Sequence, residues 1–120
     1  MADASNVSSA SLAGTQPFSY EIEPEQGATT LRLAGDLDMA ASPTLRDVLQ
    51  GLQRGGSEMI VDLRRLTFLD SMGLAVLLEA HTAGREGLPS VSFIPGGRCV
   101  QKVFSVTGMD KRVSWIDPLE

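Results

Sequence analysis

Strand-like and helix-like apolar patterns alternate along most of this 120-residue chain, and the alternation leaves few folds open. Two alternating segments, 18–24 and 29–35, flank a short glycine-containing turn and predict an antiparallel hairpin. The spacing beyond them predicts three helices, each followed by a strand, with the strands at 58–63, 90–94 and 112–116. Strands joined through helices pair in parallel. The sequence therefore predicts one α/β domain with a mixed five-stranded sheet, an N-terminal antiparallel hairpin, parallel βα units and about three helices.

The first strand and the residues before it set the boundary of the predicted domain. Residues 1–17 are mostly small and polar, which predicts a disordered tail before a domain that spans 18–117. Phe18, Tyr20 and Ile22 alternate with polar residues and share one face. That alternation predicts a half-buried strand.

Two positions in the sequence have the features of helix starts. Ser42 precedes a proline and is expected to be the N-cap of the first helix. Asp70 and Ser71 interrupt an apolar run where a loop enters the second helix, at the carboxyl edge of a strand. Such a pair either only caps the helix or contributes to a binding site, because ligands of open α/β sheets bind at that edge. Gly73 is expected to leave the Ser71 hydroxyl uncrowded, and a larger residue there is expected to change stability little.

The composition limits the classes of partner and the cellular compartment that we expect for this protein. A net charge of −5 argues against nucleic acid as a partner, because phosphate-backbone binding depends on Lys and Arg. No run approaches the ~18 apolar residues of a membrane span, and the N-terminal residues lack the features of a secretory signal. We therefore expect a cytoplasmic protein with no membrane partner. The single cysteine, Cys99, permits no intrachain disulfide and is expected to be a small buried hydrophobe.

Three motifs resemble those of the STAS domain family, and within it the bacterial anti-sigma factor antagonists. They are "GDLDMAASPTLRDVL", "MIVDLRRLTFLDSMGLAVL" and "CVQKVFSVTGMDKRV", and together the likeness extends over roughly 18–116. The middle motif, with its Asp-Ser pair followed by a glycine, is the specific one. Two features depart from the family: Met72 stands where a small residue is usual, and only "DPLE" follows the last strand in place of a C-terminal helix.

The resemblance implies a protein that is not an enzyme but the substrate of one. In the family, the unphosphorylated antagonist binds an anti-sigma factor that is also a serine kinase, and this binding frees a sigma factor. Phosphorylation of the serine after the motif Asp, here Ser71, ends the binding, and a PP2C-type phosphatase resets the switch. The partner-contacting residues are expected to be Asp36, Asp38, Asp70, Met72, Gly73 and Leu74. The protein is expected to be a monomer when free and to need no cofactor.

Two other functions remain as alternatives. The first is a non-enzymatic STAS accessory subunit of a transport or other signalling complex. The second is an enzyme with Ser71 as nucleophile, but the surrounding residues lack the first glycine of a Gly-x-Ser-x-Gly elbow. The only histidine, His81, lies about 15 Å along the same predicted helix and is expected to be a helix-edge residue. A metal site is not expected either, because Asp36 and Asp38 have no third ligand near them.

Overall fold

The computed structural model describes residues 16–118, and in this part of the chain the sheet order follows the chain order, β1-β2-β3-β4-β5. The strands are β1 (Ser19–Glu25), β2 (Ala28–Leu37), β3 (Glu58–Leu69), β4 (Val91–Ile94) and β5 (Ser114–Trp115). The helices are α2 (Ser42–Arg54), α3 (Ser71–Arg85), α4 (Arg98–Val106) and the short 3₁₀ helix η2 (Met109–Lys111). β1 and β2 are antiparallel, and the other pairs are parallel. The predicted fold class is therefore confirmed; most of the predicted tail lies outside the described residues.

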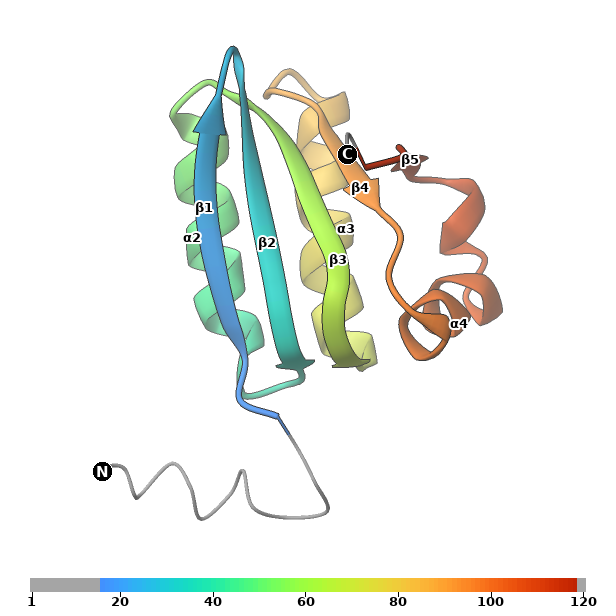
Figure 1. Cartoon of the computed structure of the whole chain (residues 1–120). Helices are drawn as coiled ribbons and strands as arrows, with labels where there is room; N and C mark the ends of the chain where they lie inside the picture. Colours follow the sequence, from blue (N-terminus) through green and yellow to red (C-terminus); the bar gives the residue numbers. More distant parts are fainter. Residues whose placement is uncertain (1–15, 119–120) are drawn as a thin grey trace, which may run out of the picture.

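One layer of helices covers one face of the sheet (Figure 1). The buried side chains of the strands and of α2, α3 and α4 form a single core. The fully buried members include Leu31, Leu33, Leu37, Leu45, Val61, Leu63, Leu77, Phe93 and Phe104. Near β5, the rings of Phe104 and Trp115 meet edge to face, with their centroids 5.0 Å apart. Removal of this apolar area from water is the main source of stability for the two-layer structure.

The first strand is more exposed than its alternating pattern predicts. Every residue of β1 is exposed, including Tyr20 at 40% and Ile22 at 46%. These two side chains lie beside Leu33 and Leu31 of β2, which are completely buried. Within residues 16–118, β1 pairs with β2 alone, so its side chains are covered from one side. Of the three predicted face residues, Phe18 packs partly buried against the core, while Tyr20 and Ile22 keep a little under half of their surface exposed.

A buried carboxylate, Asp62, lies in the middle of β3 with 4% exposure. Arg64 binds it through two side-chain nitrogens, at 3.0 Å from Nε to Oδ1 and 2.8 Å from Nη2 to Oδ2. Burial works to raise the pKa of the Asp62 carboxyl, but the hydrogen bonds from the Arg64 side chain and backbone outweigh it and hold the pKa below its usual range. Asp62 is therefore a charged structural residue of the sheet.

The two central strands extend further than the sequence predicts. β3 runs to Leu69 and β2 to Leu37, so Asp36 belongs to a strand and not to a loop. The pairing of the two strands shifts register twice, between Arg32 and Ala34 and between Gly35 and Asp36. Because the strands end side by side, they place the starts of α2 and α3 at the same edge of the sheet.

Candidate functional site

The candidate site lies where β2 and β3 end and α2 and α3 begin, at the lower end of the molecule in Figure 1. We call it the Ser71 edge and define it as residues 36–42 and 67–74. Parallel strands present their carboxyl ends here, the edge at which open α/β sheets bind their ligands. The structure therefore brings together the two sequence segments that carry the predicted site residues.

Hydrogen bonds of Asp70 connect the start of α3 with the end of β2 and the turn that follows it. It is the N-cap of α3, and its Oδ1 accepts a hydrogen bond from the Gly73 backbone N–H at 2.9 Å. Its Oδ2 accepts from the Met39 backbone N–H at 3.0 Å. The Asp70 backbone N–H donates to the carbonyl of Leu37, at 3.3 Å. One side chain thus caps α3 and also holds the turn that leads into α2.

Ser71 is the first residue of α3 and is exposed. Its hydroxyl makes no hydrogen bond with any residue in the described part of the chain. Of the two capping candidates, Asp70 takes the role. The Ser71 hydroxyl is consequently free for chemistry at the positive end of the α3 dipole.

Asp36 and Asp38 are both engaged in local structure. Asp36 accepts from the Thr67 hydroxyl at 2.6 Å through Oδ1 and from the Gln16 backbone N–H at 3.1 Å through Oδ2. Asp38 accepts from the Ala41 N–H at 3.0 Å, and its carbonyl accepts from the Ser42 hydroxyl at 2.8 Å. Their carboxylates add negative charge to the Ser71 edge while holding its backbone.

The start of α2 corrects the prediction for Ser42. The N-cap is Ala41, without a side-chain hydrogen bond, and Ser42 is the first helical residue. Ser42 is buried at 2% exposure, so its hydroxyl is directed inward to the Asp38 carbonyl. We expected the Ser42 side chain to accept a hydrogen bond from a backbone N–H at the start of α2. The Asp38 carboxylate is the side chain that accepts such a bond there, from the Ala41 N–H.

Gly73 and Leu74 are buried beneath the Ser71 edge, where the first turn of α3 packs against the sheet. Leu74 is 4% exposed and belongs to the core. A Cβ on the buried Gly73 would lie 2.7 Å from both the Cγ and the carbonyl oxygen of Leu37, and 2.9 Å from Cδ1 of Leu69. Gly73 therefore permits close packing of α3 on β2. The expectation that a larger residue at position 73 changes stability little is therefore wrong, whereas contact of Gly73 and Leu74 with a partner stays a prediction.

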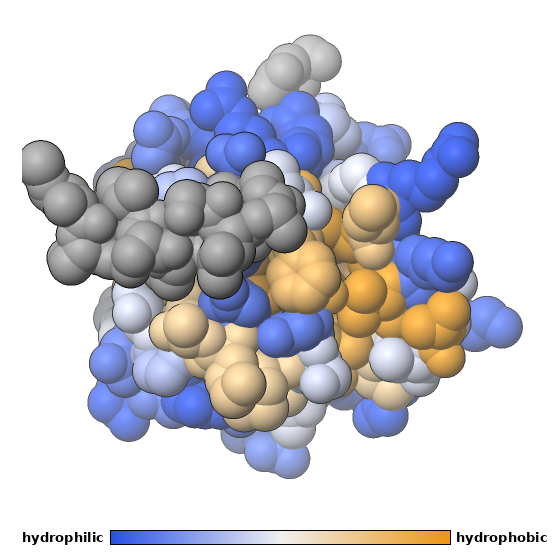
Figure 2. Space-filling view, turned by 90° about the horizontal axis from the view of Figure 1, so that it is seen from below, coloured by the Kyte–Doolittle hydropathy of each residue, from blue (hydrophilic) through white to orange (hydrophobic). Residues whose placement is uncertain are grey.

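Three large apolar side chains of the Ser71 edge are unusually exposed. They are Met39 at 66%, Phe68 at 46% and Met72 at 46%. In the view from below, Figure 2 shows apolar surface gathered in the middle of this end of the molecule, among hydrophilic residues. We call Met39, Phe68 and Met72 the apolar rim. Apolar residues grouped on a surface in this way mark interaction sites.

The sequence reasoning found Met72 but missed the other two members of the rim. Phe68 and Leu69 are adjacent in a strand, and successive side chains point to opposite faces, so only one could enter the core. Met39 is a large apolar residue in a tight turn, where polar residues are usual. Both signals were readable in the sequence.

His81 and Cys99 lie outside the Ser71 edge. His81 is partly buried, and burial lowers its pKa, with the charges of Arg85 and Arg112 acting in the same direction. Cys99 is exposed on α4, so the prediction of a small buried hydrophobe is wrong. Its neighbour Val100 occupies the buried position.

No three His, Cys, Asp or Glu side chains in residues 16–118 are grouped so that they could hold a metal ion. None of the helices in that range has the length and apolar character to cross a membrane.

Solved structures of similar fold include an anti-sigma factor antagonist from Mycobacterium paratuberculosis. It gives a TM-score of 0.75 at 21% identity, over 86% of this chain and 88% of that one. The unphosphorylated anti-sigma factor antagonist SpoIIAA gives 0.71 at 23% identity, over 85% of this chain and 90% of that one. The phosphorylated form of SpoIIAA, from Bacillus, gives 0.67 at 22% identity, over 85% and 93%. These likenesses support the fold described above.

Sequence comparisons agree with the structural ones. The Anti-sigma-B factor antagonist of Bacillus subtilis (strain 168) is 21% identical over 92 residues, which are 77% of this chain and 84% of that protein. A family model described as "Mlab, STAS domain" matches residues 21–118, a range that contains all the helices described and all of the sheet except the first two residues of β1. The chain therefore belongs to the STAS domain family.

Proposed function

We propose that this protein is a cytoplasmic anti-sigma factor antagonist that binds its partner through the Ser71 edge and is switched by phosphorylation of Ser71. The observation that carries the proposal is the exposed Ser71 hydroxyl, without a hydrogen bond in residues 16–118, on the same edge of the sheet as the apolar rim. The names of the similar proteins support the same function. In this proposal the partner is an anti-sigma factor with serine kinase activity, and binding releases a sigma factor.

The apolar rim supplies the affinity of the unphosphorylated form. Met39, Phe68 and Met72 are each about half exposed or more in the free protein, and a partner that covers them removes apolar area from water. Methionine side chains adapt to irregular surfaces, so two of the three anchors suit a partner that must be bound and released. Exposed aromatic residues such as Phe68 are typical anchors of interfaces.

A phosphate on Ser71 would stand at the same edge as this apolar contact. It adds about −1.5 to −2 charges and three acceptor oxygens. The N-terminus of α3 stabilises such an anion, so the domain stays folded. The neighbouring carboxylates of Asp70, Asp36 and Asp38 offer no compensating charge. Burying the phosphate without a partner charge costs several kcal/mol, enough to abolish micromolar binding.

The protein itself performs no reaction in this scheme. The kinase of the partner transfers the phosphoryl group from ATP to the Ser71 oxygen, and a PP2C-type phosphatase removes it. The intact Asp70 cap keeps Ser71 on a rigid helix start in both states. The switch therefore needs no refolding.

A second candidate function is that of a non-enzymatic accessory subunit of a transport or other signalling complex. The description of the matching family model, "Mlab, STAS domain", gives the domain family and fits this function as well. In that case the apolar rim is a permanent interface, and binding does not respond to ATP.

One experiment separates the two functions. The full chain is used to capture its partner from native lysate, the captured partner is produced recombinantly, and binding is titrated calorimetrically with and without Mg-ATP. We expect ATP to release the wild type, to add one phosphate at Ser71 by mass analysis, and to leave Ser71→Ala bound. Ser71→Asp should fold and bind more weakly. Ser105→Ala, at an exposed serine on α4, is the matched control and should behave as the wild type does.

Two results would reject the phosphoswitch. One is binding of wild type, Ser71→Ala and Ser71→Asp with equal affinity and no response to ATP, which indicates the accessory subunit. The other is phosphate mapped to a different residue.

A further inference from the structure

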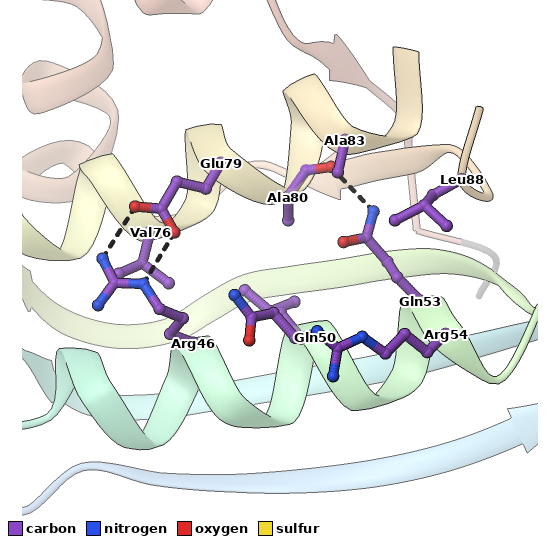
Figure 3. A pocket seen from close by; sticks show the side chains of 10 residues that line it. Arg46, Gln50, Gln53, Arg54, Val76, Glu79, Ala80, Ala83 and Leu88 are labelled. Atoms are coloured by element: carbon purple, nitrogen blue, oxygen red, sulfur yellow. Dashed lines mark hydrogen bonds and ion pairs between the residues drawn. The ribbon is translucent and has the colours of Figure 1, made fainter. Parts of the chain in front are cut away.

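A pocket of about 180 Å³ lies between α2 and α3, away from the Ser71 edge (Figure 3). Its lining comes from the middle and the end of both helices, whereas the Ser71 edge contains their first residues. Five apolar side chains form much of its wall: Leu49, Val76, Ala80, Ala83 and Leu88. An aliphatic group of a ligand is therefore matched by an apolar surface inside a concave site.

A buried amide opens onto this pocket. Gln53 is only 3% exposed, and its Nε2 donates to the carbonyl of Ala80 at 2.9 Å and, more weakly, to that of Pro89 at 3.4 Å. These bonds fix the side chain. Its Oε1 accepts no hydrogen bond from any residue of 16–118 and points toward the interior of the pocket in Figure 3. A fixed and unused carbonyl oxygen in an apolar wall selects a ligand with an N–H donor.

The charges around the pocket favour an anion. Arg46 and Glu79 neutralise each other through two hydrogen bonds of 2.8 Å, Nε to Oε1 and Nη2 to Oε2. Arg54 also lines the pocket and makes no ion pair within the described part of the chain. The lining thus carries one unbalanced positive charge, although the whole chain carries −5. A guanidinium without a partner is suited to a carboxylate.

We propose that this pocket binds an N-acylated aliphatic amino acid, either free or as the carboxyl-terminal residue of a peptide. The carboxylate pairs with Arg54, the adjacent amide N–H donates to Oε1 of Gln53, and the aliphatic side chain lies on the apolar wall. This site is separate from the Ser71 edge and does not depend on the function proposed there.

The simplest probe is N-acetyl-L-leucine, titrated into the full-length protein and followed by amide NMR. A ligand of this size supports a Kd on the order of 1 mM. We expect saturable shifts confined to the later turns of α2 and α3 and to the segment that contains Leu88. Two ligand analogues test the contacts without changing the protein. N-acetyl-L-leucine amide lacks the carboxylate, N-acetyl-N-methyl-L-leucine lacks the donor, and each should bind about fivefold more weakly or worse.

Two exposed or half-exposed positions test the pocket from the protein side. Arg54→Gln should weaken N-acetyl-L-leucine about fivefold and leave the binding of its amide unchanged. Arg98→Gln, which removes an exposed cation on α4, is the matched control. Ala83→Met should fill the pocket and abolish binding, while Ala75→Met, on the same helix but outside the lining, should bind as the wild type does.

The outcomes identify the source of the ligand or overturn the proposal. Tighter binding of acetyl-Gly-Gly-Leu than of N-acetyl-L-leucine assigns the site to a peptide terminus, and the reverse order assigns it to a free acyl amino acid. Absence of saturation with both ligands, shifts centred on the Ser71 edge, or equal binding by the Ala83→Met variant would overturn it. None of these results bears on phosphorylation of Ser71.

Discussion

Replacing Gly73 by alanine tests how α3 is held against the sheet. In most helices this change is favourable by roughly 0.5–1 kcal/mol, because alanine restricts the unfolded chain. At Gly73 the added Cβ would lie 2.7 Å from the Leu37 carbonyl oxygen and from its Cγ, and 2.9 Å from Cδ1 of Leu69. The Leu69 methyl and the Leu37 side chain can move a little, but the Leu37 carbonyl is backbone that also accepts from the Asp70 N–H.

The magnitude follows from these contacts. Overpacking of a tight site costs about 1–3 kcal/mol, and the alanine preference offsets less than half of the upper value. We expect a net loss of about 2 kcal/mol and a fall in Tm of roughly 5 °C or more. Gly73→Leu should be worse, because the remaining side-chain atoms have no space between α3 and β2.

Gly51 provides a matched control. It lies inside α2, is exposed, and a Cβ there would have nothing within 4 Å. Gly51→Ala should therefore gain about 0.5–1 kcal/mol. Urea titration of both variants, followed by circular dichroism, gives the two values with their signs. If Gly73→Ala is as stable as Gly51→Ala, the close approach of α3 to Leu37 is not what requires glycine, and our account of this position is refuted.

Asp70 and Asp62 give the remaining predictions. Asp70→Ala should lose about 1–3 kcal/mol of stability in urea titrations, because both the α3 cap and the bond to Met39 disappear. Asp70→Asn keeps an acceptor for the cap and should recover about half; equal losses in the two variants would show that the cap bond to Gly73 contributes nothing, and wild-type stability of Asp70→Asn would show the same of the Met39 bond. Folding lowers the pKa of the Asp62 carboxyl, so the charged form stabilises the fold. Wild type should therefore be more stable than Asp62→Asn above about pH 4. The difference in stability should disappear as the pH falls through the folded-state pKa. A stability difference independent of pH between 2 and 7 would contradict the ion pair with Arg64.

The order and type of the elements could be predicted because apolar spacing reports them directly. Leu45, Leu49 and Leu52 share one side of α2, and the parallel strands consist of continuous apolar runs. The burial of individual side chains could not be predicted in the same way. Tyr20 and Ile22 alternate as core residues do, but an edge strand does not bury them, and nothing local in the sequence marks β1 as an edge.

The candidate site was predictable in its location but only in part in its chemistry. The position of Ser71 at the start of a helix follows from the sequence. The partners of Asp36 and Asp38 do not, because they depend on Thr67 and on the turn at Ala41, which only the folded backbone places within reach. Gly73 shows the same limit: its neighbour Leu37 is 36 positions away in sequence, and only the pairing of β2 with β3 brings them together.

The sheet order has a consequence for how the chain acquires its structure during synthesis. Because β1 to β5 lie in the sheet as they lie in the sequence, each new strand adds to the edge of what has already formed. Strands that pair in the sheet are therefore separated in the chain by a turn or by one helical segment. As the ribosome releases the chain, β2 and β3 can pair once β3 has emerged, without waiting for a distant C-terminal strand to be inserted between them. A domain with this order can be extended or shortened at its β5 side with little effect on the first units to fold.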